Sequence, residues 1–145
     1  MSAEERIPPT GEVREFESPR ELFQFLDEEI SRLRASLGEL LRRLEAAKAK
    51  AEMMTKLESI LRQLSGQGGL GGTVLTMDNV NVYINPNPKQ EYDVLVDLIR
   101  RMQDRIVYLE RVRKGLEPLS GLGDVNITLE VVLINGVPKN IIVKM

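Results

Sequence analysis

The sequence contains no cysteine, no histidine and no tryptophan, and aromatic residues make up only 4% of its 145 residues. The absence of cysteine excludes disulfides, thiolate nucleophiles and zinc sites built from thiolates. The absence of histidine removes the commonest general base and the commonest ligand of transition metals, so catalysis would have to rest on carboxylates, lysine, tyrosine or serine. We therefore expect a protein that is not an enzyme and that uses no metal or other cofactor.

An apolar run of transmembrane length is also missing, and the first residues, Met-Ser-Ala-Glu-Glu-Arg, are charged where a signal peptide needs an apolar stretch. We expect a cytoplasmic protein without a membrane partner. Arginine outnumbers lysine 13 to 7, which together with the missing residue types suits the composition of a thermophile.

What the sequence does contain is largely aliphatic. Hydrophobic residues make up 42% of the chain, and with so few rings the core must consist of Leu, Ile, Val and Met. Such a composition suits helix seams better than a ligand pocket. The net charge of -2 is unevenly spread, because residues 1–30 carry nine acids against three arginines and residues 31–64 carry eight bases against four glutamates.

The length is that of one domain. Residues 1–17 have the composition of a flexible acidic arm, to which we assign no structure. For residues 18–145 we expect a single domain of the α+β class, with a long coiled-coil helix and a second, shorter helix, each followed by a β-hairpin. A faint internal likeness of the loops leaves open two helix–hairpin units, 18–85 and 87–145, although chance similarity explains it as well.

The first helix is marked by a capping box at Ser18-Pro19-Arg20-Glu21, and its apolar residues then alternate in steps of three and four. At 1.5 Å per residue the helix from Pro19 to Leu64 is roughly 70 Å long. The rest of the chain is too short to cover it, so we expect another subunit against residues 23–44. The positions a and d of this predicted oligomer seam are Phe23, Leu26, Ile30, Leu33, Leu37, Leu40, Leu44, Ala47, Ala51 and Met54.

The strict heptad repeat breaks at Glu58, the next a position, and the apolar stripe continues after a shift of about three residues. We expect residues 57–64 to pack on the chain's own second helix and hairpin. The glycine-rich stretch 66–72 then ends the helix. It lacks lysine and follows a helix, so a flexible linker is favoured over a phosphate-binding loop.

Two hairpins are predicted. Thr73 to Met77 and Val80 to Ile84 flank Asp78-Asn79, and alternation places Val80, Val82 and Ile84 on a buried face. Residues 125–134 and 141–145 flank Asn135-Gly136. There a two-residue turn would pair Leu129 with Ile142 and mix the faces, so we prefer a longer loop that pairs Leu133 with Val143. We expect this second hairpin to pair with the first one or with another subunit.

The second helix begins with a cap at Asn87, followed by Pro88, and ends near Gly115. Its basic residues could contact nucleic acid, but acids alternate with them at ion-pair spacing and Tyr108 is the one aromatic nearby, so a nucleic-acid partner is not favoured. The acidic run Asp27-Glu28-Glu29 points in three directions on a helix and cannot converge on one cation. The possible nucleic-acid contacts are Arg100, Arg101, Arg105, Arg111, Arg113 and Lys114.

The order helix, glycine-containing turn, hairpin and helix, with heptads in both helices, resembles the layout of prefoldin-type chaperone subunits. The resemblance covers Phe23 to Leu116 and includes both strands of the first hairpin. It implies subunits that assemble through their hairpins into β-barrels and hold unfolded chains between coiled-coil arms. The chain differs in its much shorter second helix and in its C-terminal hairpin, where prefoldin chains end in a helix.

We therefore expect a non-enzymatic, oligomeric coiled-coil scaffold or chaperone-like adaptor. Its partners would be further copies of itself, as a homodimer or a higher homo-oligomer, and other proteins. The alternative is a nucleic-acid-associated accessory protein that uses the arginine-rich second helix.

Overall fold

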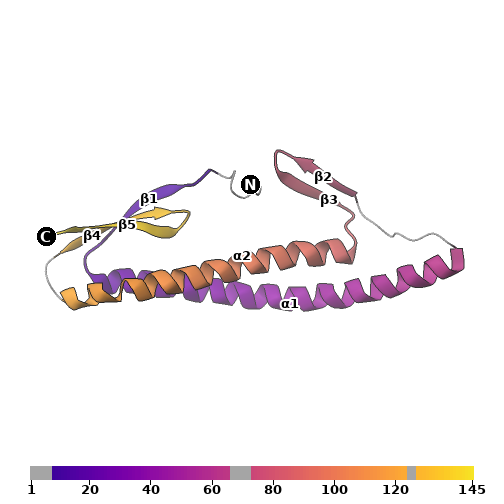
Figure 1. The fold of residues 1–145 in the computed structure, drawn as a ribbon, viewed down its shortest axis with the longest axis horizontal. Helices are drawn as coiled ribbons and strands as arrows, with labels where there is room; N and C mark the ends of the chain where they lie inside the picture. The colour runs from indigo at the N-terminus through magenta and orange to yellow at the C-terminus, as the bar shows by residue number, and fades with distance from the viewer. Residues whose placement is uncertain (1–7, 66–72, 124–126) are drawn as a thin grey trace. The chain divides into compact units, whose positions relative to one another are not determined.

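The structure is a computed structural model that describes residues 8–65, 73–123 and 127–145 (Figure 1). These residues form two long α-helices, α1 (Pro19–Ser65) and α2 (Pro88–Gly115), a short 3₁₀ helix (Glu117–Leu122) and two antiparallel sheets. The α+β class expected from the sequence is confirmed. The predicted glycine-rich linker, residues 66–72, lies outside the described residues.

Both helices begin at the predicted N-caps, and the full reciprocal capping box is formed at α2. The hydroxyl of Ser18 accepts a hydrogen bond from the Glu21 N–H at 3.3 Å, and the Glu21 carboxylate accepts one from the Glu17 N–H at 2.9 Å. At α2 the side chain of Asn87 accepts from the Gln90 N–H at 2.8 Å, and the side chain of Gln90 accepts from the Asn87 N–H at 3.0 Å. Donors that a helix start leaves unpaired are satisfied at both sites.

The chain forms two compact units. Unit 1 consists of Met1–Arg34 and Asp104–Met145, and unit 2 consists of Ala35–Gln103. The division passes through both helices, so each unit holds part of α1 and part of α2. The division groups segments that lie close together in space. It does not separate one helix and its following hairpin from the next pair along the chain.

Unit 1 is built on a three-stranded antiparallel sheet in the order β1 (Gly11–Phe16), β4 (Thr128–Ile134) and β5 (Val137–Lys144). Side chains on β4 alternate, so that one face is fully buried and the other is half-buried. The start of α1 and the end of α2 complete this core (Figure 1). Its largest fully buried side chains are Leu22, Leu26, Leu109, Leu129, Val131 and Leu133.

The expectation of a flexible arm over residues 1–17 is wrong for Gly11–Phe16, which form β1. All six residues pair with β4, and Thr10 and Asn135 exchange hydrogen bonds of 2.8 Å and 2.7 Å over a separation of 125 residues. Only Phe16 of the strand is buried, against Phe25 at 5.6 Å between ring centroids. The strand is held by backbone pairing with a remote segment, and that pairing leaves no hydrophobic pattern in the sequence.

β1 is also the third strand of the sheet that contains the C-terminal hairpin. That hairpin was expected to pair with the first hairpin or with another subunit. The prediction that this hairpin pairs with the first hairpin is wrong, since β2 (Thr73–Met77) and β3 (Val80–Ile84) form a separate two-stranded sheet.

The loop preferred for the C-terminal hairpin is wrong as well. Asn135 and Gly136 form a tight two-residue turn, with φ of 52° and 78°. A register shift at Val132/Leu133 then takes up one extra residue, so that Leu129 lies opposite Val143 and Glu130 opposite Ile142. A β-bulge of this kind lets a tight turn coexist with an unmixed apolar face.

Unit 2 contains the remainder of α1, the first part of α2 and the β2–β3 hairpin. Ala47, Leu95 and Ile99 are its buried apolar side chains. The hairpin has the predicted strands and the predicted turn, with φ of 47° at Asp78 and 65° at Asn79. Two consecutive left-handed residues are the geometry of a type I′ turn, which matches the twist of the flanking strands.

Candidate interaction surfaces

The predicted oligomer seam of α1 is covered inside the chain. In unit 1, Leu26, Ile30 and Leu33 are 0%, 5% and 7% exposed. In unit 2, Ala47 is buried and Leu37, Leu40, Leu44, Ala51 and Met54 are half-buried. α2 lies along α1 in each unit, and its residues Leu95, Ile99, Ile106 and Leu109 are buried. The seam therefore has a partner helix in its own chain, while a seam contact between subunits stays a prediction.

Beyond Thr55 three of the four leucine and isoleucine side chains of α1 are exposed, and Leu61 is half-buried. Leu57, Ile60 and Leu64 are 45%, 51% and 80% exposed, so the prediction that they pack on the second helix and hairpin is wrong. The reason is where α2 begins: Lys89 and Tyr92, in its first turns, line a hollow together with Thr55. α1 runs on for roughly three turns past that point.

The second uncovered surface is the β2–β3 hairpin. All ten strand residues are exposed. The register places five aliphatic side chains on one side of the hairpin, while Val74, Thr76, Asn81 and Tyr83 share the other, where Thr76 Oγ1 donates to Asn81 Oδ1 at 2.9 Å. The aliphatic face, as we call the first side, consists of Leu75 (41% exposed), Met77 (62%), Val80 (61%), Val82 (39%) and Ile84 (45%).

The sequence pattern predicted that Val80, Val82 and Ile84 would be buried. Within the chain they are exposed, although they share a face as expected. The strands of this hairpin carry no charged residue, and the single charge in residues 73–84 is Asp78 in the turn. The pattern of a half-buried strand is thus present without anything in the described chain that buries it.

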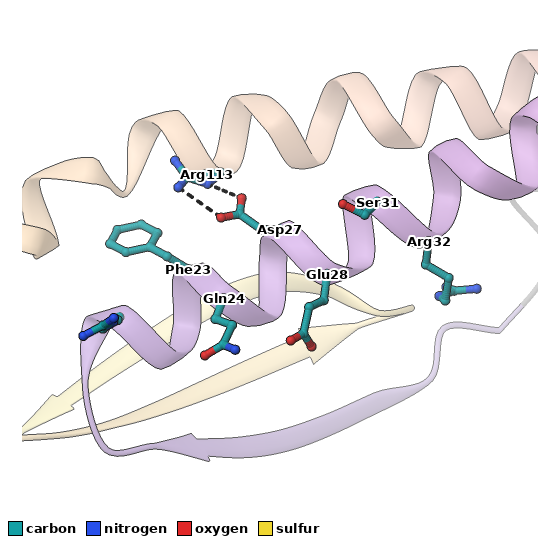
Figure 2. Close-up of a pocket in the computed structure, with 8 residues that line it drawn as sticks. Phe23, Gln24, Asp27, Glu28, Ser31, Arg32 and Arg113 are labelled. Carbon is teal, nitrogen blue, oxygen red and sulfur yellow. Dashed lines mark hydrogen bonds and ion pairs between the residues drawn. The ribbon is translucent and has the colours of Figure 1, made fainter.

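A wide, open depression of about 900 Å³ lies in unit 1 on the first turns of α1 (Figure 2). Arg113 of α2 lines it and donates to Asp27 through Nε at 2.5 Å and through a terminal nitrogen at 3.2 Å. The guanidinium also lies 5.3 Å from the centroid of the Phe23 ring. The hydrogen bond to Asp27 raises the pKa of Arg113, against the opposite effect of burial.

The side chains that line this depression provide few groups for catalysis or ligand binding. Of its two carboxylates, Asp27 and Glu28, the first is already bound to Arg113, and Arg32 is bound to Glu29. Ser31 lines the hollow, but the chain has no histidine to activate it. Within the described residues no group of three or more carboxylates could hold a metal ion. We interpret the depression as a solvated surface between ion pairs.

The basic residues proposed for nucleic-acid contact are mostly engaged within the chain. Arg100 and Arg101 both bind Asp97, at 2.8 Å and 2.9 Å. Arg105 donates to the Asn135 carbonyl at 2.8 Å, and Arg113 binds Asp27. Arg111 and Lys114 are exposed. The acids between these bases make the surface mixed in sign, where phosphate binding favours a continuous basic surface.

No family model, curated protein or solved structure matches the chain. Among the described helices, none combines the length and the apolarity needed to cross a membrane.

The surroundings predicted for the end of α1 are wrong, since Leu57, Ile60 and Leu64 are exposed. The face of Val80, Val82 and Ile84 is exposed within the chain, and its burial by another subunit stays a prediction. The heptad break at Glu58 was the sequence signal for the exposed end of α1. Where a heptad repeat ends, the helix packed against it is also expected to end.

Proposed function

We propose that the chain is a non-enzymatic, oligomeric scaffold or chaperone-like adaptor with a coiled-coil body, which binds copies of itself and other proteins. The observation that carries the proposal is the β2–β3 hairpin, where seven large apolar side chains are between 36% and 62% exposed. An isolated two-stranded hairpin is at best marginally stable in water. A partner that covers it would bury apolar area and stabilise it.

The free edges of this hairpin support the same proposal. Monomeric proteins protect edge strands with lysine, proline or a bulge, because a bare edge can pair with another chain. β2 and β3 contain neither residue type, and their register is uninterrupted. By contrast, β5, at an edge of the other sheet, contains Pro138, Lys139 and Lys144 and pairs with β4 through a bulge.

A nucleic-acid accessory role has less support. Four of the six bases proposed for it are bound within the chain, so phosphate binding would have to compete with these contacts. Failure to bind DNA or RNA at low salt, where phosphate contacts are strongest, would remove this alternative.

Sedimentation of the full chain tests the proposal. We expect a dimer or larger species, and we expect Val82→Lys to shift the protein towards monomer because it places a charge on the aliphatic face. Asn81→Lys is the matched control, since it places the same charge on the other face of the same strand. A wild-type chain that remains monomeric from micromolar to millimolar concentration contradicts the proposal.

A further inference from the structure

Two of the apolar surfaces that unit 2 leaves exposed fit one another. One is the aliphatic face of β2–β3, and the other is the stripe at the end of α1 formed by Met53, Leu57, Ile60 and Leu64, which we call the α1 stripe. We infer that two copies of the chain exchange these surfaces, so that the aliphatic face of each copy covers the α1 stripe of the other. The inference rests on the proposed function only in requiring that the chain self-associates.

The α1 stripe is a helix face that lacks its partner. Its members are spaced by four, three and four residues, which places them along one side of a helix. They are 72%, 45%, 51% and 80% exposed in chain order. A helix buries such a stripe against another helix or against a sheet, and packing a helix on a sheet is a common two-layer arrangement.

The dimensions of the two surfaces agree. From Met53 to Leu64 the helix rises roughly 16 Å, and a five-residue strand such as β2 or β3 is also roughly 16 Å long. Two strands about 5 Å apart give the hairpin a width comparable to the diameter of a helix. The α1 stripe can therefore lie along the full length of the aliphatic face.

The chemistry of the surfaces favours a second copy as the occupant. All nine side chains are uncharged and aliphatic or thioether, so neither surface selects an acidic or a basic partner. Each chain carries one of each surface. A two-fold axis then lets every stripe meet a face with nothing left over, which is the closed, isologous arrangement that most homodimers adopt.

The area argues for an exchange of both surfaces. Complete covering of the nine side chains would bury on the order of 100 Å² each, an upper limit of roughly 900 Å² per copy, against about 800 Å² per partner in a stable interface of standard size. Contact between two aliphatic faces alone, or between two α1 stripes alone, reaches about half of that value. Only the exchange covers both surfaces.

Cysteine cross-linking can test this inference cleanly because the native chain has no cysteine. An Ile60→Cys chain and a Val82→Cys chain of different mass are mixed, allowed to re-equilibrate and treated with a short bis-maleimide. We expect a mixed cross-linked dimer in several-fold excess over the dimers that either variant forms alone. Leu57→Cys mixed with Leu75→Cys repeats the measurement at neighbouring positions, in case one variant does not fold.

The matched control is a mixture of Ser59→Cys and Asn81→Cys, residues next to the tested ones that point to other sides of their elements. This mixture should cross-link no more than its components alone. A chain carrying both Ile60→Cys and Val82→Cys should give linked dimers. A link formed within one chain would show that the surfaces cover each other inside a monomer and would overturn the inference.

The remaining outcomes separate this inference from the proposed function. Cross-linking of Val82→Cys with itself, or of Ile60→Cys with itself, in an oligomeric protein overturns the exchange and leaves the oligomeric scaffold standing. A wild-type chain that is monomeric by sedimentation overturns both.

Discussion

Neighbouring residues of the three-stranded sheet differ sharply in their surroundings. Leu129 on β4 is completely buried, whereas Ile142 on β5, which belongs to the opposite face, is 46% exposed. The two side chains are isomers that differ in both face and strand: β4 is the central strand, whereas β5 is an edge strand on which Val143, opposite Leu129, is also 43% exposed. The bulge between Val132 and Leu133 decides which residues of β5 share the buried face.

Replacing these two residues separately should have unequal effects. We expect Leu129→Ala to lower the free energy of unfolding by about 2–5 kcal/mol, because it leaves a cavity in a packed core. The control, Ile142→Ala, should cost about 1 kcal/mol or less, because its side chain is already half in water. Denaturant unfolding of both variants measures the difference, and equal losses would contradict the register described for β4 and β5.

At the scale of the elements, the contribution of a glycine to stability depends on whether it lies in a turn or inside a helix. Gly136, in the β4–β5 turn, has φ of 78°, and a Cβ placed there would lie 3.5 Å from a guanidinium nitrogen of Arg105. Gly38 lies inside α1, and a Cβ there would meet nothing within 4 Å. Only the first position needs the left-handed backbone that glycine adopts without penalty.

Alanine substitution at the two glycines should therefore change stability in opposite directions. We expect Gly136→Ala to destabilise the protein by about 1 kcal/mol, since a residue with Cβ is strained at positive φ. Gly38→Ala should stabilise it by about 0.5–1 kcal/mol, because alanine is the better helix former. Thermal unfolding followed by circular dichroism measures both changes. A loss of stability from Gly38→Ala would mean that this side of α1 is covered by another chain.

The break in the heptad series at Glu58 has a structural counterpart. Up to Met54 the a and d residues of α1 are buried or half-buried, and the first turns of α2 line a hollow with residues as far as Thr55. The exposed stripe, from Met53 to Leu64, spans the break and lies on a different side of the helix. The contact within the chain thus ends in the same turns of α1 in which the surface that we assign to a second copy lies.

For the whole molecule, self-association should couple stability to concentration. A partner that binds only the folded state stabilises it by mass action, so the melting temperature should rise with protein concentration. We expect this rise to persist at high salt, because the proposed interface contains no ion pair that salt would screen. Scanning calorimetry over a hundredfold range of concentration tests the effect. The Val82→Lys variant should lose this dependence, whereas Asn81→Lys should retain it.

A melting temperature that does not change with concentration would contradict association through the folded state. A rise that disappears at high salt would indicate instead that the charged residues of the helices hold the copies together.

The sequence by itself determined the features that depend on near neighbours along the chain. The starts of both helices follow from capping residues three positions apart, and the β2–β3 turn follows from Asp78-Asn79. Such interactions close within a few residues, so local chemistry is enough to predict them. The α+β class follows from the same local signals.

Only the tertiary structure decided which apolar surfaces are covered. β1 pairs with a strand more than a hundred residues away. The register of β5 is set by a bulge that the turn residues do not predict. The α1 seam is covered by the chain's own second helix, while the α1 stripe and the aliphatic face are not. Hydrophobic periodicity shows which side of an element is suited to burial. Whether that side is buried depends on where other elements begin and end in space.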